Sequence, residues 1–136
     1  MVFDTKIVLV IRDDIELWQK LNVTAFLTSG VTGACQNILG AEYMDADNTL
    51  YHSLVVQPMI IMSASRETLH RTRQRATNRG VKMAVYIEDM FSTNHDDANR
   101  QAVMQYTGDM LPLVGLALRA ERKTMDKITK GLKLHD

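Results

Sequence analysis

Cysteine is nearly absent from this 136-residue chain: Cys35 is the only one, so no disulfide can form within the chain. This composition suits a reducing compartment, and the N-terminus shows no basic region followed by an apolar stretch, so we expect a cytoplasmic protein. No apolar run is long enough to span a bilayer, and no membrane partner is expected. Surplus charge is also absent. The 16 Lys and Arg balance 16 Asp and Glu, which argues against an obligate nucleic-acid binder.

The usual fingerprints of nucleotide-binding and hydrolytic sites are missing as well. The chain has no G-x-G-x-x-G, no P-loop lysine motif and no G-x-S-x-G elbow. Its four histidines are scattered without an H-x-x-x-H or C-x-x-C partner. We therefore expect neither a metal nor a cofactor. The segment Asp45–Asp47 faintly resembles the start of a calcium loop but lacks the later glycine and glutamate, so a plain turn is predicted there.

Apolar runs alternate with helical patterns and predict a single α/β domain over residues 1–136. Four strands are predicted, at residues 6–11, 54–62, 81–87 and 111–118. Pro58 in the second strand, and Pro112 with Gly115 in the fourth, predict an edge position or a bulge. We expect a three-layer α/β/α arrangement around a small mixed, mostly parallel four-stranded sheet. Residues 41–53 are polar and are expected to be irregular.

Three helices are predicted around this sheet. The first is capped by Asp14 or begins nearer Lys20, and it ends near Gly30 or resumes to Gly40. The second covers residues 66–79, between a Ser65 cap and Gly80. A terminal helix covers residues 121–130. A further short helix is expected over residues 96–106.

A dense group of polar residues follows the third predicted strand. Its members lie within twelve positions of one another: Glu88, Asp89, Ser92, Thr93, Asn94, His95, Asp96, Asp97 and Asn99. Capping of the short helix by Thr93 or Asn94 explains about half of them. Ligands of α/β sheets bind outside the carboxyl ends of strands, so the walls of a site are expected at residues 12–14 and 88–89. An imidazole there suits a general base.

Two other features have both a functional and a structural interpretation. Asn22 shares a helix face with Trp18 and Phe26, and is either an amide that fastens the helix to a loop or a residue of the site. Arg71, Arg75 and Arg79 also share a face. This face is either a phosphate or RNA patch or, as the narrow apolar stripe beside it favours, a solvated outer face.

Several motifs are similar to those of a known protein family. The chain resembles peptidyl-tRNA hydrolase II along almost its full length. The resemblance lies in the opening strand K-I-V-L-V-I-R-D-D, the N-V-T-A-F helix start, the strand ending I-E-D-M-F-S-T and the finish K-I-T-x-x-L-K-L. A closer likeness is to an uncharacterised offshoot, the domain of unknown function family two thousand. It rests on W-Q-K-L-N-V-x-A-F-L, Q-P and M-F-x-T-x-H-D-x-A-N, here residues 18–27, 57–58 and 90–99.

The resemblance implies the hydrolase fold and, by analogy, a homodimer. It puts Asp89 and Thr93 where the hydrolase has its functional aspartate and threonine, and Asn22 where the hydrolase has its lysine. Without that lysine, peptidyl-tRNA is not the expected substrate. The candidate catalytic residues are Asn22, Asp89, Thr93 and His95, and the candidate substrate-binding residues are Trp18, Asp14, Asp96 and Asn99.

The preferred hypothesis is a domain that binds a small molecule or hydrolyses an ester or amide, with its site at the carboxyl ends of strands one and three. His95 would act as the general base, oriented by Asp89 or Asp96. The alternatives are a non-enzymatic RNA- or tRNA-binding relative of the hydrolase, in which Arg71, Arg75 and Arg79 face the cleft, and a dimeric interaction protein.

Overall fold

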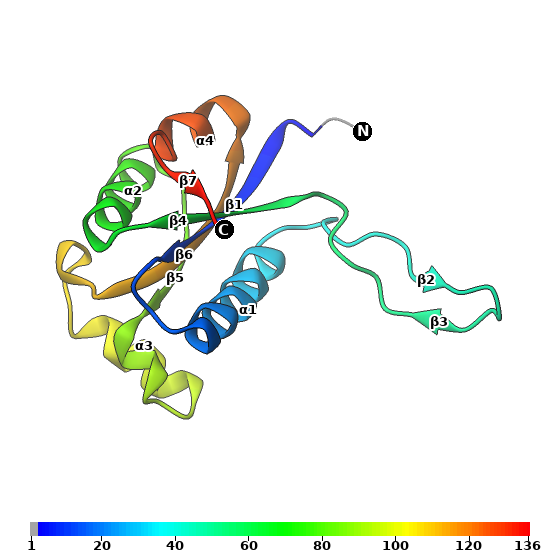
Figure 1. The fold of residues 1–136 in the computed structure, drawn as a ribbon, viewed down its shortest axis with the longest axis horizontal. Coiled ribbons are helices and arrows are strands. Elements are labelled where there is room, and N and C mark those ends of the chain that lie inside the picture. The colour runs from blue at the N-terminus through cyan, green and yellow to red at the C-terminus, as the bar shows by residue number, and fades with distance from the viewer. Residues whose placement is uncertain (1–2) are drawn as a thin grey trace.

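The chain forms a mixed α/β structure in a computed structural model that describes residues 3–136 (Figure 1). Within these residues the main sheet has five strands: β1 (Thr5–Arg12), β4 (Met59–Ala64), β5 (Ala84–Ile87), β6 (Leu113–Glu121) and β7 (Lys133–Leu134). Two short strands, β2 (Tyr43–Met44) and β3 (Leu50–Tyr51), pair separately. The helices are α1 (Leu17–Gly33), α2 (Arg66–Asn78), α3 (Asp96–Met104) and α4 (Arg122–Ile128), with 3-10 turns η1 (Glu88–Phe91) and η2 (Gly108–Met110).

The main sheet has the strand order β5-β6-β1-β4-β7, and only the β1–β4 pair is parallel. The expectation of a mostly parallel, four-stranded sheet is therefore wrong in both strand number and direction. The reason is β6, which inserts between β5 and β1 and runs antiparallel to both. A buried apolar run marks a strand covered on both faces, but it does not reveal the direction of that strand.

Proline sets the boundaries of two strands instead of placing them at an edge. Pro58 precedes β4, so the strand expected from Leu54 starts only at Met59. Pro112 likewise precedes β6, which lies inside the sheet. The expected bulge is present: Tyr86 pairs with Gly115 while Ile87 pairs with Leu113, which leaves one extra residue in β6.

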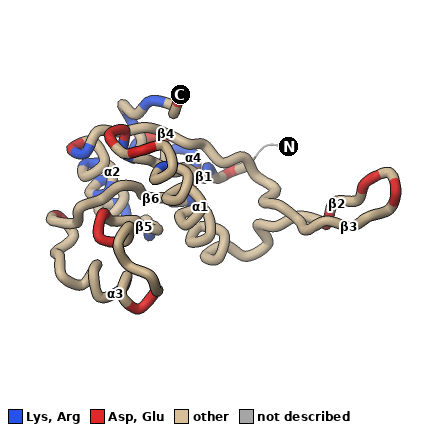
Figure 2. Tube along the Cα trace, turned by 60° about the horizontal axis from the view of Figure 1, so that its bottom comes forward, with Lys and Arg blue, Asp and Glu red and all other residues tan. Residues whose placement is uncertain are grey.

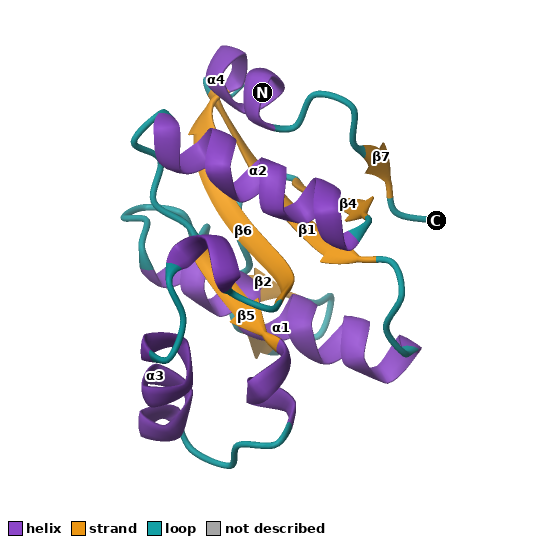
Figure 3. Ribbon diagram, turned by 90° about the vertical axis from the view of Figure 1, so that its left-hand side faces the viewer, coloured by secondary structure: helices purple, strands orange, loops and turns teal. Residues whose placement is uncertain are grey.

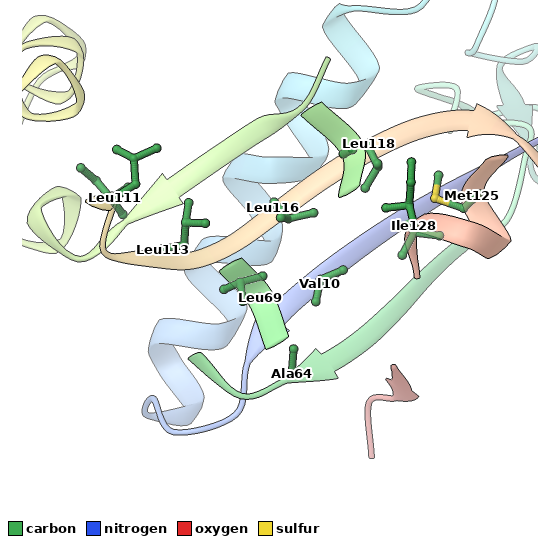
Figure 4. Close-up of a cluster of buried hydrophobic side chains, with 12 residues drawn as sticks. Val10, Ala64, Leu69, Leu111, Leu113, Leu116, Leu118, Met125 and Ile128 are labelled. Carbon is green, nitrogen blue, oxygen red and sulfur yellow. The ribbon is translucent and has the colours of Figure 1, made fainter. Parts of the chain in front are cut away.

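Helices cover both faces of the sheet, as Figure 3 shows. Alternate residues of β1 point to opposite faces, so Ile7, Leu9 and Ile11 pack with α1 residues such as Val23 and Leu27. On the other face, a second apolar cluster joins the sheet to α2 and α4 (Figure 4), and includes Val10, Leu69, Leu116, Leu118, Met125 and Ile128. The central strands β1 and β6 are thus mostly buried on both sides.

The helix boundaries follow the sequence signals only in part. The prediction for α2 is confirmed, because the Ser65 hydroxyl accepts from the Thr68 N–H at 3.2 Å and Gly80 has a φ of 68°. Helix α1 is capped by Glu16, in a capping box with Gln19, and not by Asp14. It continues without a break to Gly33. None of the helices within residues 3–136 is long and apolar enough to cross a membrane.

Residues 39–56 form a two-stranded arm that extends away from the sheet (Figure 1). The expectation of an irregular segment is wrong at this point, because β2 pairs with β3 and Leu39 bridges to Val55. The expected turn is present at the tip. The Asp45 carboxylate accepts N–H bonds from Asp47 at 2.9 Å and Thr49 at 3.0 Å, and a bond from the Tyr51 hydroxyl at 2.8 Å.

We predict that Gly115→Ala lowers the free energy of unfolding by about 1–3 kcal/mol, because it overpacks a close contact between helix and sheet. A methyl group at position 115 would lie 2.8 Å from Val23 Cγ1 and 2.9 Å from Leu27 Cδ1. The matched control is Gly33→Ala at the end of α1, where no atom lies within 4 Å of the added group. Urea denaturation of both variants checks the prediction, and equal stability would contradict it.

The turn of the arm predicts a measurable effect of pH. The backbone N–H of Thr49 and the Tyr51 hydroxyl hold the pKa of Asp45 below its usual value. The stabilisation of the turn is therefore complete above the ordinary aspartate pKa of about 3.9, and is lost as the pH falls through the lower folded-state pKa. NMR titration of the Asp47 and Thr49 amides should show this midpoint, and Asp45→Asn should abolish it. A midpoint at or above the ordinary value would contradict the turn.

Candidate functional site

Three strands end at the same edge of the sheet. β1 and β5 are both antiparallel to β6, and β4 is parallel to β1, so the carboxyl ends of all three strands lie together. Arg12 connects the strand ends at this edge. Its guanidinium donates to Glu88 at 2.7 Å, to Asp14 at 2.5 Å and to the Leu113 carbonyl at 3.0 Å. The Arg12 side chain is only 9% exposed. Burial opposes its charge, but the bonds to Glu88 and Asp14 prevail and raise the pKa of Arg12.

The polar segment after β5 folds into η1, a short loop and α3. His95 is the N-cap of α3: its Nδ1 atom accepts from the Ala98 N–H at 3.2 Å, so the prediction of a Thr93 or Asn94 cap is wrong. Asp96 and Asp97 occupy the first turn and form ion pairs with Arg100. Most of the charge in this segment is therefore engaged in holding the helix start.

A cavity of about 510 Å³ lies between α1 and this segment. We call it the aromatic cavity. Its lining comes from α1, the end of β5, η1 and the start of α3: Trp18, Asn22, Phe26, Tyr86, Met90, Phe91, Thr93, Asn94, His95, Asp96 and Asn99. The cavity is open to solvent, because Trp18 and Phe26 remain more than half exposed. It lies beside the edge that Arg12 organises.

Aromatic rings form a connected wall of this cavity. Ring centroids are 5.8 Å apart for Trp18 and Phe91, 5.2 Å for Tyr86 and Phe91, and 6.0 Å for Phe26 and Tyr86. These separations are typical of tilted and edge-on aromatic pairs. The wall presents an apolar surface to any molecule in the cavity.

Uncharged hydrogen-bonding groups stand beside the rings. The Tyr86 hydroxyl donates to Asn22 Oδ1 at 3.3 Å. This bond uses the amide oxygen of Asn22 and does not involve its amide hydrogens. Burial raises the pKa of the Tyr86 phenol. The Thr93 hydroxyl bonds to the Met90 carbonyl at 3.1 Å and to the Asn99 side chain. Since His95 Nδ1 accepts a bond, the ring proton lies on Nε2, which is a donor.

Six of the eight residues predicted for the site line the aromatic cavity: Trp18, Asn22, Thr93, His95, Asp96 and Asn99. The other two are placed elsewhere. The Asp89 carboxylate accepts from the Tyr106 hydroxyl at 3.0 and 3.2 Å, and this bond raises the pKa of Tyr106. Asp14 pairs with Arg12. Neither carboxylate lies among the residues around the cavity.

Sequence reasoning missed Tyr86 and Phe91 as cavity residues. Tyr86 belongs to the apolar end of a strand, and its orientation depends on pairing with β6. Phe91 lies in η1, which has no periodic pattern. Phe26 had a usable signal, because it follows Asn22 by four residues in α1.

Two further observations bear on the chemistry available. Within residues 3–136, no group of three or more His, Cys, Asp or Glu side chains is arranged to hold a metal ion. A second, more apolar cavity of about 530 Å³ shares Phe26, Tyr86, Met90, Asp96 and Asn99 with the aromatic cavity and continues between β5 and α3. A larger cavity of about 920 Å³ includes Gly80 and Glu121, and none of the predicted site residues lines it.

Comparison with known proteins gives a consistent family assignment. No curated protein matches the chain. The solved structure of a protein of unknown function from Agrobacterium tumefaciens strain C58 is 47% identical in sequence and has a TM-score of 0.97. The match covers 99% of this chain and 100% of that one. The family model described as protein of unknown function (DUF2000) matches residues 5–136. The chain therefore belongs to this family of proteins of unknown function.

Proposed function

We propose that this protein binds a small, uncharged molecule with a planar polar group in the aromatic cavity. The observation that carries the proposal is the lining itself, in which amide, hydroxyl and imidazole groups stand beside a connected aromatic wall. Ligand sites typically combine an apolar surface with a few placed polar groups. The only carboxylate in the lining, Asp96, is paired with Arg100. A neutral ligand therefore suits the cavity better than an ion.

The hydrogen-bonding groups match the edge of an amide or a heterocycle. The Asn22 amide supplies donors, because its oxygen already accepts from Tyr86. His95 Nε2 supplies another donor. Asn94 and Asn99 also line the cavity and carry both donors and acceptors. An apolar substituent on such a ligand would extend into the neighbouring cavity between β5 and α3.

The resemblance of the sequence motifs to peptidyl-tRNA hydrolase II supports the location of the site. The differences from that family at the site disfavour the hydrolase's reaction. We propose the α/β/α layering of that fold, with the site at the carboxyl ends of β1 and β5. Asn22 replaces the charged lysine, and Asp89 is engaged by Tyr106. Binding of a ligand without that reaction requires neither the lysine nor a free Asp89 carboxylate.

Hydrolysis of an ester or amide is the second candidate. The Thr93 hydroxyl, the Asn22 amide and the His95 imidazole line one cavity, which favours it. The basic nitrogen of His95 is Nδ1, which would have to give up its bond to the Ala98 N–H before it could accept a proton as a base. Binding is therefore preferred over catalysis.

The arrangement of the α2 cations gives no support for an RNA-binding cleft. Arg75 donates to the Lys130 carbonyl at 2.9 Å and Arg71 to the Thr68 hydroxyl at 3.2 Å. Arg79 lines the cavity beside Gly80 and Glu121, and none of the three arginines is among the residues that line the aromatic cavity. Helix α2 packs on the sheet face opposite α1, away from the aromatic cavity.

We predict that neutral planar amides and heterocycles bind in the aromatic cavity. Suitable probes are benzamide, uracil and adenine, with an affinity in the millimolar range, or about −4 kcal/mol. Trp18 is the only tryptophan of the chain, so its fluorescence reports directly on the cavity. Asn22→Leu removes the amide at similar volume and should weaken binding about tenfold.

The control for this titration is Gln101→Leu, which makes the same kind of change on an exposed part of α3 outside the lining. It should bind the probes as the unaltered protein does. Failure of every probe to change Trp18 emission would contradict the proposal. Equal loss of binding in both variants would show that the effect does not come from the cavity.

We predict that His95 contributes to stability as a cap and not to turnover as a base. His95→Ala should lower the free energy of unfolding by about 0.5–2 kcal/mol, whereas His95→Asn restores a capping acceptor and most of the stability. Denaturation measures both, and an ester and amide panel is assayed in parallel. Turnover by the unaltered protein that falls about 10²-fold or more in both variants would establish the hydrolase alternative instead.

A further inference from the structure

The arm of residues 39–56 exposes an unusual amount of apolar surface. Seven large side chains along it are between 51% and 63% exposed: Leu39, Tyr43, Met44, Leu50, Tyr51, Leu54 and Val56. Side chains of this size each leave on the order of 100 Å² uncovered at such exposure, which gives roughly 700 Å² over the two faces of the arm. The Tyr43–Tyr51 and Met44–Leu50 pairs lie on opposite faces, so each face exposes about half of this area. Apolar patches of that size on one face are often interaction sites.

Hydrogen bonds join the two strands of the arm in spite of this exposure. Backbone bonds join Gly40 N–H to the Leu54 carbonyl at 3.0 Å and Val56 N–H to the Ile38 carbonyl at 2.9 Å. The Asp45 turn closes the far end. An isolated two-stranded ribbon is marginally stable in water unless its apolar side chains are covered. The arm therefore has the form of an element that packs against another molecule.

A matching apolar surface lies on the outer side of α1. Leu17 is 71% exposed and Leu21 is 64% exposed. Both leucines line a cavity of about 310 Å³, and Lys20 and Ile61 of β4 also line it. A helix with large apolar residues on its solvent side is normally buried in an assembly. We call this region the α1 surface.

Charge distinguishes the possible occupants of these surfaces. The arm contains Glu42, Asp45 and Asp47 and neither Lys nor Arg, and Figure 2 shows the acidic residues near its tip. All 16 Lys and Arg thus lie outside the arm, against 13 of the 16 acids, which leaves the rest of the chain three charges positive. An acidic tip is repelled by nucleic acid and by anionic lipid. A second copy of this chain offers the apolar surface and, summed over the residues outside the arm, a net charge of the opposite sign.

We propose that the arm is a dimerisation element, and that the arm of each copy packs on the α1 surface of the other. The contact is reciprocal about a two-fold axis. Each copy contributes one face of its arm together with its α1 surface, and burying both contacts at once brings the area toward the roughly 800 Å² per partner of a stable interface. This inference does not depend on ligand binding.

Analytical ultracentrifugation at micromolar concentration tests the proposal. The full chain should sediment as a dimer. Met44→Lys combined with Leu50→Lys in the arm should weaken dimerisation at least 100-fold, and Leu17→Lys combined with Leu21→Lys on the α1 surface should do the same. Far-UV circular dichroism of each variant verifies that the main sheet and helices remain folded.

Met104→Lys is the control, because Met104 is 82% exposed on α3 and belongs to neither surface. It should remain dimeric. A monomeric unaltered protein would overturn the proposal, and so would a dimer that is unaffected by the arm variant. A dimer sensitive to the arm but not to the α1 surface would overturn the assigned docking site. Should the arm variant unfold, a shortened arm in which two glycines replace residues 42–52 gives the same comparison.

Discussion

One buried guanidinium organises the edge of the sheet on which the candidate site depends. Arg12 joins the end of β1 to Glu88 at the exit of β5 and to the carbonyl of Leu113 at the start of β6. A backbone bond of 2.9 Å from Asp13 to Ala64 extends the edge to β4. A buried cation is tolerated only when its charge and hydrogen bonds are satisfied, so these strand ends must stay together. The turn and loop that follow β5 begin from this fixed point.

Pairing of the carboxylates with neighbouring side chains explains why the cavity offers mostly neutral groups although its sequence neighbourhood is highly charged. Glu88 and Asp14 are engaged by Arg12, Asp89 by Tyr106, and Asp96 and Asp97 by Arg100. The groups left toward the cavity are amides, hydroxyls and an imidazole that already caps a helix. Charged groups thus hold the strand ends and the start of α3 in place, while the cavity itself offers hydrogen-bonding groups and aromatic rings.

Part of this arrangement could be predicted from the sequence. The i, i+4 spacing of Trp18, Asn22 and Phe26 indicates a shared helix face, and all three residues line the cavity. The direction of β6 could not be predicted, because an apolar run carries no sign of parallel or antiparallel pairing. Asp89 looked like a site residue because it follows a strand, but the η1 turn places its carboxylate against Tyr106. The arm was missed because its strands β2 and β3 are only two residues long.

We propose that the aromatic cavity selects an uncharged planar ligand by its amide groups. The most direct measurement is an NMR titration that follows the side-chain amide resonances of Asn22 and Asn99 with nicotinamide and, separately, with nicotinate. The two probes have the same ring and differ in charge. We expect saturable shifts of both resonances with nicotinamide and little or no change with nicotinate. Equal binding of the two probes, or no shift with either, would contradict it.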